Sequence, residues 1–217
     1  MTERQKILDR SKCNNPKKYG IDITLTFRYM LCYLITFTVG LILYYVIKVP
    51  HSRTLDSFID SYFSQKIAFD KNMSNNILSI IDASLPDIKT MILIFVSGFT
   101  LFCSPALYGL LSYHALSLGF SSIYLLSAMS RGDLPNINFF ALVFFLLINS
   151  ITSSMMILYS VKSRLFCDQF KSLGGRKKLI LRSKPLYSHI LTLLVVCGGI
   201  ISINIFRFLF NIFLRKG

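Results

Sequence analysis

The sequence predicts an all-α fold: a polytopic membrane helix bundle with about five transmembrane helices and short amphipathic helices in the external loop after the first. Two observations support this prediction. Only 16% of the 217 residues are charged, against about 25% in soluble domains. Several uncharged runs also reach the roughly 20 residues that a helix needs to cross a bilayer. The longest run, residues 90–130, contains no Lys, Arg, Asp or Glu.

The sequence predicts two parts: a basic cytoplasmic N-terminal tail, residues 1–26, and a five-helix transmembrane domain, residues 27–217. The first helix is predicted over residues 27–47. We expect no cleavable signal peptide, because the polar tail is long, the apolar run is too long for an h-region, and "KVPHSR" is not a small-residue cleavage site. We therefore expect this helix to be a retained anchor.

The long uncharged run must reverse direction within the membrane. A single helix of that length would be about 60 Å long, twice the thickness of the hydrocarbon core. We expect two helices, over residues 90–111 and 115–129, with the reversal at Ser112–His114, the most polar point near the middle. Pro105 is expected to kink the first of these two helices, because proline removes a backbone hydrogen bond.

Two further helices complete the predicted bundle, over residues 137–159 and 186–206. The turn sequence "RGDLPN" precedes the first of them, and Pro185, a suitable first-turn residue, precedes the second. The connecting segments are then an external loop, residues 48–89, and a basic cytoplasmic loop, residues 160–185.

The distribution of Lys and Arg predicts the orientation. Seven lie between Arg4 and Arg28 and eight between Lys162 and Lys184. Placing both groups inside puts fifteen basic residues in the cytoplasm and nine outside, which favours an inside N-terminus and an outside C-terminus. The net charge of +14 does not indicate nucleic-acid binding here, because both groups flank apolar runs and neither segment is long enough to fold as a domain.

The external loop contains apolar residues at helical spacing. The first set is Leu55, Phe58, Ile59, Tyr62 and Phe63, and the second is Ile77, Leu78, Ile81 and Leu85. Such faces lie on the outer membrane surface or dock an extracytoplasmic partner, and the two interpretations are compatible.

Residues typical of catalysis are missing from the predicted helices, which contain no Asp or Glu. The three histidines, His51, His114 and His189, fall near predicted helix ends and form no ligand or triad pattern. The five cysteines are scattered without a C-x-x-C pair. We therefore expect no enzymatic activity, no metal and no cofactor.

The segment "NSITSS", from Asn149 to Ser154, places polar side chains in the middle of the fourth predicted helix. Interhelical hydrogen bonding and close packing are favoured over a path for a solute. Five glycines are interpreted in the same way, as places where helices touch: Gly98, Gly109, Gly119, Gly198 and Gly199.

The stretch "LFCSPALYGLLSYHALSLGFSSIYLL" resembles the central signature of the stage II sporulation protein M family of spore-forming Firmicutes. Members have a glycine-rich start to the second helix, then a proline, a small turn and a Gly-Phe pair in the third helix. A turn with Leu-Pro and an amide residue follows. The matching positions here are Gly98, Pro105, the turn at His114–Ala115, Gly119, Phe120, Pro135 and Asn136.

This resemblance implies a non-enzymatic membrane scaffold in the septal membrane of the mother cell. The scaffold would act with stage II sporulation proteins D and P in the peptidoglycan remodelling that drives engulfment during endospore formation. The partners would carry the wall hydrolysis. The alternative is a small membrane transporter or permease subunit, with the Pro105 kink and the Asn149 segment lining a path. Homo-oligomerisation stays open.

Overall fold

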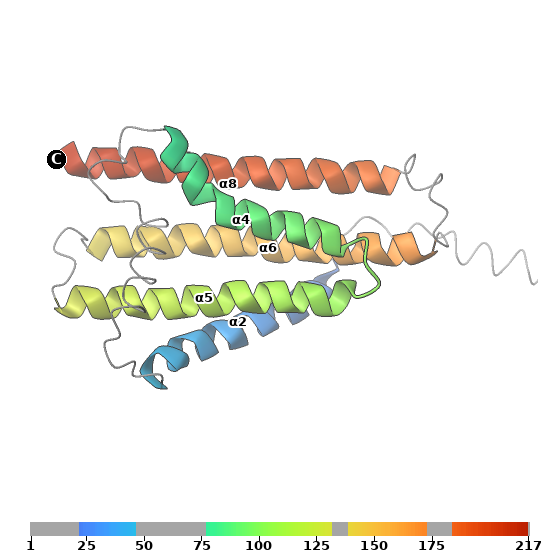
Figure 1. Ribbon diagram of the computed structural model, residues 1–217, viewed down its shortest axis with the longest axis horizontal. Helices are drawn as coiled ribbons and strands as arrows, with labels where there is room; N and C mark the ends of the chain where they lie inside the picture. The colour runs from blue at the N-terminus through green and yellow to red at the C-terminus, as the bar shows by residue number, and fades with distance from the viewer. Residues whose placement is uncertain (1–21, 47–76, 132–138, 173–183, 217) are drawn as a thin grey trace, which may run out of the picture.

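The computed structural model describes residues 22–46, 77–131, 139–172 and 184–216, and nearly all of these are helical. The five helices are α2 (Ile23–Val46), α4 (Ile77–Ser97), α5 (Cys103–Arg131), α6 (Phe139–Ser172) and α8 (Lys184–Lys216). No strand occurs within the described ranges. The helices run side by side (Figure 1), so the predicted all-α helix bundle is confirmed.

Four of these helices are long and apolar enough to cross a membrane. The spans are Ile23–Val46, Cys103–Ser127, Val143–Lys171 and Lys184–Leu209. Helix α4 has 21 residues but carries Asp82, Asp87 and Lys89, so its composition is less apolar. It nevertheless packs along α5, α6 and α8 (Figure 1). The chain thus has the features of a multi-pass membrane protein, and the fifth crossing, by α4, stays a prediction.

The first helix begins four residues before its predicted start, because Asp22 caps it. The backbone N–H of Leu25 donates to the Asp22 carboxylate over 3.1 Å, as expected for an aspartate at the N-cap. The apolar residues of α2 then continue to Val46, close to the predicted end.

The predicted reversal at Ser112–His114 is wrong. The chain turns at residues 98–102 instead, and α5 runs without a break through His114. The turn is closed by backbone hydrogen bonds from Gly98 to Phe95 and from Thr100 to Ser97, at 3.1 and 3.0 Å. Ser112 and His114 contact polar side chains of other helices. These contacts explain why two polar residues lie in the middle of a membrane helix, and no turn is needed there.

The kink predicted at Pro105 is also wrong. Pro105 is the third residue of α5, where its missing N–H would have no intrahelical partner in any case. The proline inside a helix is Pro86 in α4. It cannot donate the usual helical hydrogen bond, and α4 changes direction along its length (Figure 1).

Helix α6 extends well past its predicted end at residue 159. Its 34 residues would measure about 51 Å, longer than a hydrocarbon core is thick. The added part contains Lys162, Arg164 and Lys171, which favour helix well enough for the membrane helix to continue past the interface. The predicted basic loop, residues 160–185, is therefore partly helical.

The helices associate as two pairs on either side of α6. Helix α2 makes its most extensive contact with α5, and α4 makes its most extensive contact with α8. In the first pair the backbones touch: a Cβ on Gly119 would collide with the Phe37 carbonyl oxygen, and one on Gly40 would collide with that of Leu116. Small residues allow this close approach between membrane helices.

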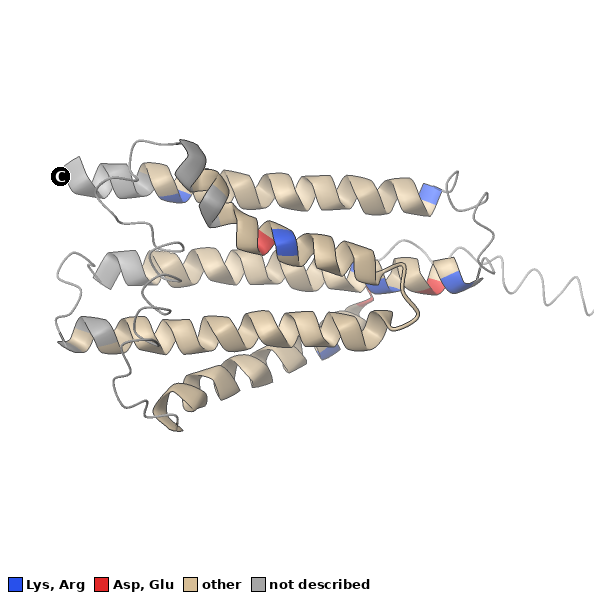
Figure 2. Ribbon diagram, viewed as in Figure 1, with Lys and Arg blue, Asp and Glu red and all other residues tan. Residues whose placement is uncertain are grey.

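Most of the positive charges of the described helices lie at one end of the bundle, while one blue segment lies along α4 and another toward the opposite end of α8 (Figure 2). The end with most of the charges holds the start of α2, the 98–102 turn, the end of α6 and the start of α8 (Figure 1). We call it the basic end. Large apolar side chains on α2 and α8 are exposed along the bundle, including Leu34, Ile35, Leu194 and Val195, as expected of surfaces that face lipid.

Candidate functional site

Four polar side chains from four different helices meet inside the bundle, and we call them the polar network: Tyr33, Asp87, His114 and Ser153. The Tyr33 hydroxyl lies 3.0 Å from His114 Nδ1 and 2.6 Å from Ser153 Oγ. On the other side of the imidazole ring, His114 Nε2 lies 3.6 Å from a carboxylate oxygen of Asp87. The network thus connects α2, α4, α5 and α6.

The polar network lies deep within the membrane-spanning part. His114 is eleven residues from the start of α5 and Tyr33 is ten residues from the start of α2. At 1.5 Å per residue this places both about 15–17 Å along their helices, near the middle of a hydrocarbon core about 30 Å thick.

Burial of these polar side chains costs free energy unless they form hydrogen bonds or ion pairs with one another. Asp87 and His114 are each 7% exposed, and Tyr33 and Ser153 are 6% and 4% exposed. An ionisable side chain at this depth is expensive, and such residues almost always pair with one another or with backbone carbonyls. Here the carboxylate pairs with the imidazole across two helices.

Helix α8 supplies a cation to the same region. Arg207 lies near enough to Asp87 to interact with it electrostatically, and its guanidinium carbon is 5.5 Å from the centre of the Phe145 ring. One of its terminal nitrogens is buried without a hydrogen-bond partner. The region therefore holds a carboxylate that faces an imidazole and interacts electrostatically with a guanidinium.

Local sequence explains how α4 presents Asp87. Pro86 directly precedes it and interrupts the helical hydrogen bonding, while the Thr90 hydroxyl donates to the Pro86 carbonyl over 3.0 Å. In Figure 2 a red and a blue segment lie next to each other on α4, near the point where the helix changes direction. Broken helices with polar residues at membrane depth are typical of binding sites in membrane proteins.

A second buried histidine lies in very different surroundings. The His189 ring stacks on Phe166 at 4.5 Å, on Phe95 at 4.9 Å and on Tyr159 at 5.4 Å between ring centroids. It is 1% exposed, and neither ring nitrogen has a hydrogen-bond partner among the described residues. This histidine is held by aromatic packing.

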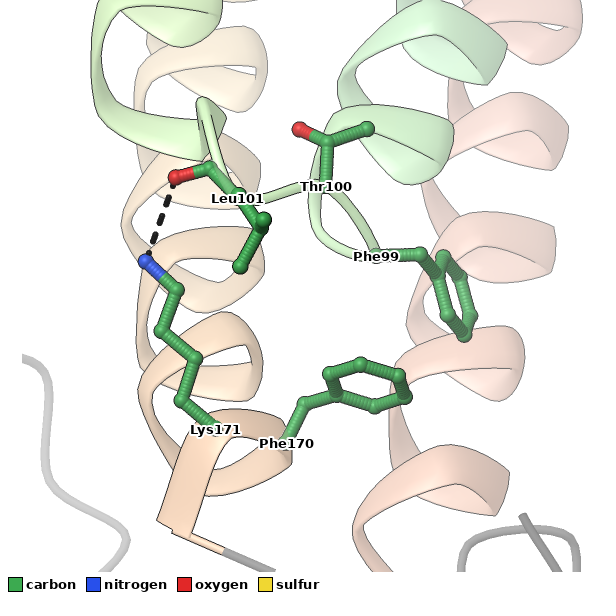
Figure 3. Close-up of a pocket in the computed structure, with 5 residues that line it drawn as sticks. All are labelled: Phe99, Thr100, Leu101, Phe170 and Lys171. Carbon is green, nitrogen blue, oxygen red and sulfur yellow. Dashed lines mark hydrogen bonds between the residues drawn. The ribbon is translucent and has the colours of Figure 1, made fainter. Parts of the chain in front are cut away.

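A small pocket opens at the basic end, where the 98–102 turn meets the end of α6. It has a volume of about 220 Å³ and is lined by Phe99, Thr100, Leu101, Phe170 and Lys171 (Figure 3). The Lys171 ammonium donates to the Leu101 carbonyl over 3.3 Å. Leu101 is 79% exposed, so the pocket is a shallow apolar recess beside one cation.

The described residues that carry the family resemblance lie in a turn and at the contact between α2 and α5. Gly98 lies in the turn after α4, where a Cβ would come within 2.8 Å of Ser163 Oγ. Gly119 lies at the α2–α5 contact, and Phe120 packs edge-on against Tyr44 at 5.6 Å between centroids. Pro135 and Asn136 fall outside the described residues.

The predicted role of Asn149 in interhelical bonding is not what the structure shows. Its side-chain amide donates to the Phe145 carbonyl of the same helix over 2.8 Å. The interhelical bond of this segment is made by Ser153, to Tyr33. For two of the five glycines, Gly109 and Gly198, an added Cβ would have nothing within 4 Å, so neither is a helix contact among the described residues.

The predicted docking faces are only partly described. Ile77, Ile81 and Leu85 belong to α4, which continues to Ser97, so they do not form a separate helix of the external loop. Ile81 and Leu85 are 52% and 40% exposed. The other predicted anchors, Leu55, Phe58, Ile59, Tyr62 and Phe63, lie outside the described residues.

Sequence reasoning missed the polar network. It assigned Asp87 to an external loop and His114 to a turn, and it gave Tyr33 no role. The available signal was Asp87 directly after a proline, within a helical pattern that continues on both sides. Within the described ranges, no group of three or more His, Cys, Asp or Glu side chains converges in a way that would hold a metal ion.

Comparison of the chain with protein-family models, with curated proteins and with solved structures finds no match.

Proposed function

We propose that this chain is a non-enzymatic membrane scaffold of the septal peptidoglycan-remodelling complex that drives engulfment during endospore formation. The observation that carries the proposal is the stretch that resembles the stage II sporulation protein M family. In the structure its residues Gly98, Pro105 and Gly119 build a tight turn, the first turn of α5 and the backbone contact between α2 and α5. These are roles that a rigid membrane support requires.

The scaffold would have its basic end in the cytoplasm, because cytoplasmic segments are rich in Lys and Arg. The C-terminus and the segment between α2 and α4 would then face the wall. A reporter enzyme that works only outside the cytoplasm, fused after Gly217, tests this orientation. Phosphatase activity of that fusion is expected, and a silent but well-expressed fusion would contradict the orientation.

The partners in this proposal are the stage II sporulation proteins D and P. The test is co-expression of the tagged full-length chain with the D and P proteins encoded by the same genome, followed by affinity purification. Both partners are expected to co-purify, and loss of the chain is expected to block engulfment. Purification of the chain without either partner, from membranes that contain all three, would contradict the proposal.

The docking surface for these partners is formed by the apolar residues between α2 and the middle of α4, which include Phe58 and Phe63. Buried aromatic anchors contribute about 2 kcal/mol or more each to an interface. The double substitution Phe58→Ser and Phe63→Ser is expected to weaken capture of the partners while membrane insertion stays normal. The matched control is Leu194→Ser with Val195→Ser, at two exposed positions on α8, which is expected to leave capture intact.

A second candidate, a small membrane transporter or permease subunit, is favoured by a separate observation. The Asp87–His114 pair lies at membrane depth beside a proline-interrupted helix, an arrangement typical of solute and ion sites. Flux of a solute into proteoliposomes that contain only this chain would support this candidate. Loss of that flux in Asp87→Asn, with engulfment unaffected, would favour it over the scaffold.

A further inference from the structure

The hydrogen atoms of the polar network can be counted from its geometry. Ser153 Oγ lies 2.7 Å from the Asn149 carbonyl oxygen, and a carbonyl can only accept. If Ser153 donates its one hydrogen there, it accepts at 2.6 Å from the Tyr33 hydroxyl. The Tyr33 oxygen then has no hydrogen left for His114, so it accepts at 3.0 Å from Nδ1–H.

This arrangement leaves the other side of the imidazole ring one hydrogen short. A neutral imidazole with its hydrogen on Nδ1 has a bare lone pair on Nε2. That lone pair faces the Asp87 carboxylate oxygen at 3.6 Å, and Nε2 has no hydrogen-bond partner. Two acceptors that face each other in a buried site are unfavourable. One additional proton between them removes the conflict.

The same four side chains also have an arrangement that needs no additional proton. Ser153 then donates to Tyr33, Tyr33 donates to His114 Nδ1, and Nε2–H points to the Asp87 carboxylate. The Ser153 contact with the Asn149 carbonyl is given up in this arrangement. The two arrangements differ by one proton, and every hydroxyl donor in the network points in the opposite direction.

We infer that the Asp87–His114 pair is a proton-binding site inside the membrane, and that Tyr33 and Ser153 transmit its state to α2 and α6. The ligand is a proton that comes from water and returns to it. Binding places the proton between Nε2 and the carboxylate oxygen, so that both ring nitrogens have hydrogens to donate. Release returns the network to the arrangement in which the hydroxyls donate toward the ring.

The charges around the pair limit how many protons it holds. From α8, the Arg207 guanidinium interacts with Asp87. From α4, Lys89 follows two residues later and is exposed. The groups contributed by α2 and α6 to the network are the neutral Tyr33 and Ser153. One bound proton gives the pair no net charge beside a guanidinium, and a second would place two positive charges together in a low-dielectric interior, which is strongly unfavourable.

This inference does not depend on the proposed function. A scaffold whose partner binding responds to the proton state of the network and a carrier that moves protons with a solute would both use the site. Its test therefore follows protonation of His114 itself.

The experiment uses the full-length chain in lipid nanodiscs, labelled with ¹³C at histidine Cε1. The double substitution His51→Gln and His189→Phe leaves His114 as the only labelled ring, and His189→Phe keeps an aromatic ring among the aromatic side chains that surround this position. Between about pH 5 and pH 9, the resonance is expected to move between the positions of a protonated and a neutral imidazole. Asp87→Asn, added to this background, is expected to weaken proton binding at His114 at least about ten-fold, because the proton on Nε2 then lacks the carboxylate oxygen that faces it at 3.6 Å.

Two outcomes would overturn the inference. One is a His114 resonance that stays constant over this pH range in the protein that retains Asp87. The other is a titration that Asp87→Asn leaves unchanged. Tyr33→Phe sharpens the test, because it removes the acceptor for Nδ1–H and is expected to change the titration. Tyr45→Phe, at a position 66% exposed on the same helix, is the matched control and is expected to change nothing.

Discussion

The two buried histidines of the bundle have opposite surroundings. His114 lies between a carboxylate and a hydroxyl contributed by other helices. His189 is stacked on three aromatic rings, and both of its ring nitrogens lack partners. They are similarly buried, at 7% and 1% exposed. The comparison shows that burial alone does not mark a functional histidine, because the polar groups that face the ring decide what it can do.

The largest expected effect follows from removing the imidazole of His114, the histidine that has polar partners. His114→Phe leaves the buried Asp87 carboxylate without its imidazole partner. Removing the partner of a buried charged group in this way costs about 3–5 kcal/mol. The free energy of unfolding, measured by denaturant titration in detergent micelles, is expected to fall by that amount. A loss below about 1 kcal/mol would mean that Asp87 does not depend on His114.

The next effect concerns the space around His189. Gly98→Ala places a methyl group 2.8 Å from Ser163 Oγ and 3.3 Å from His189 Nε2. Overpacking of this kind costs about 1–3 kcal/mol, because the stacked ring has little room to move. Gly109→Ala, which meets nothing within 4 Å, is the control and is expected to be neutral or slightly stabilising. Equal thermal stability of the two variants would contradict tight packing around His189.

A smaller effect is expected for Tyr33→Phe. The substitution removes one hydroxyl that bonds to both His114 and Ser153 and leaves the aromatic ring in place. A typical hydrogen bond contributes about 1 kcal/mol, and a partner left unsatisfied costs somewhat more. We expect a loss of about 1–3 kcal/mol in the free energy of unfolding. In a double-mutant cycle with Ser153→Ala, additive losses would show that the two residues do not interact.

The smallest effect is expected for His189→Phe. The replacement keeps an aromatic ring in a site made of aromatic rings and removes two nitrogens that have no partners. Replacing a polar group by an apolar one of similar shape is nearly neutral or stabilising when the polar group was unpaired. We expect a change within about 1 kcal/mol of zero in the free energy of unfolding. A loss as large as that of His114→Phe would erase the difference between the two histidines.

The sequence was sufficient for the class of fold and for the outer helices. The apolar runs that became α2 and α8 are uninterrupted, so their length and composition identify them without reference to the rest of the chain. The boundary between α4 and α5 was not predictable in the same way. Ser112 and His114 look like a turn in the sequence, but their partners, Cys32, Tyr33 and Asp87, come from other helices.

The candidate site was missed for the same physical reason. A charged residue next to a proline normally indicates a loop, and Asp87 follows Pro86. Only tertiary contacts reveal that the helix continues and that His114 is beside the carboxylate. Ser153 was noticed as part of a polar segment, yet its partner Tyr33 is 120 positions away. Local patterns cannot report such pairs.

The close approach of α2 and α5 has a mechanical consequence. Gly40 and Gly119 each lie against the backbone of the opposite helix. These two helices cannot slide past each other without a collision, so they form one rigid pair. Helices α4 and α8, joined by their own extensive contact, form the other pair. The Asp87–His114 contact connects the two pairs of helices, so a tilt of one pair against the other would change its length.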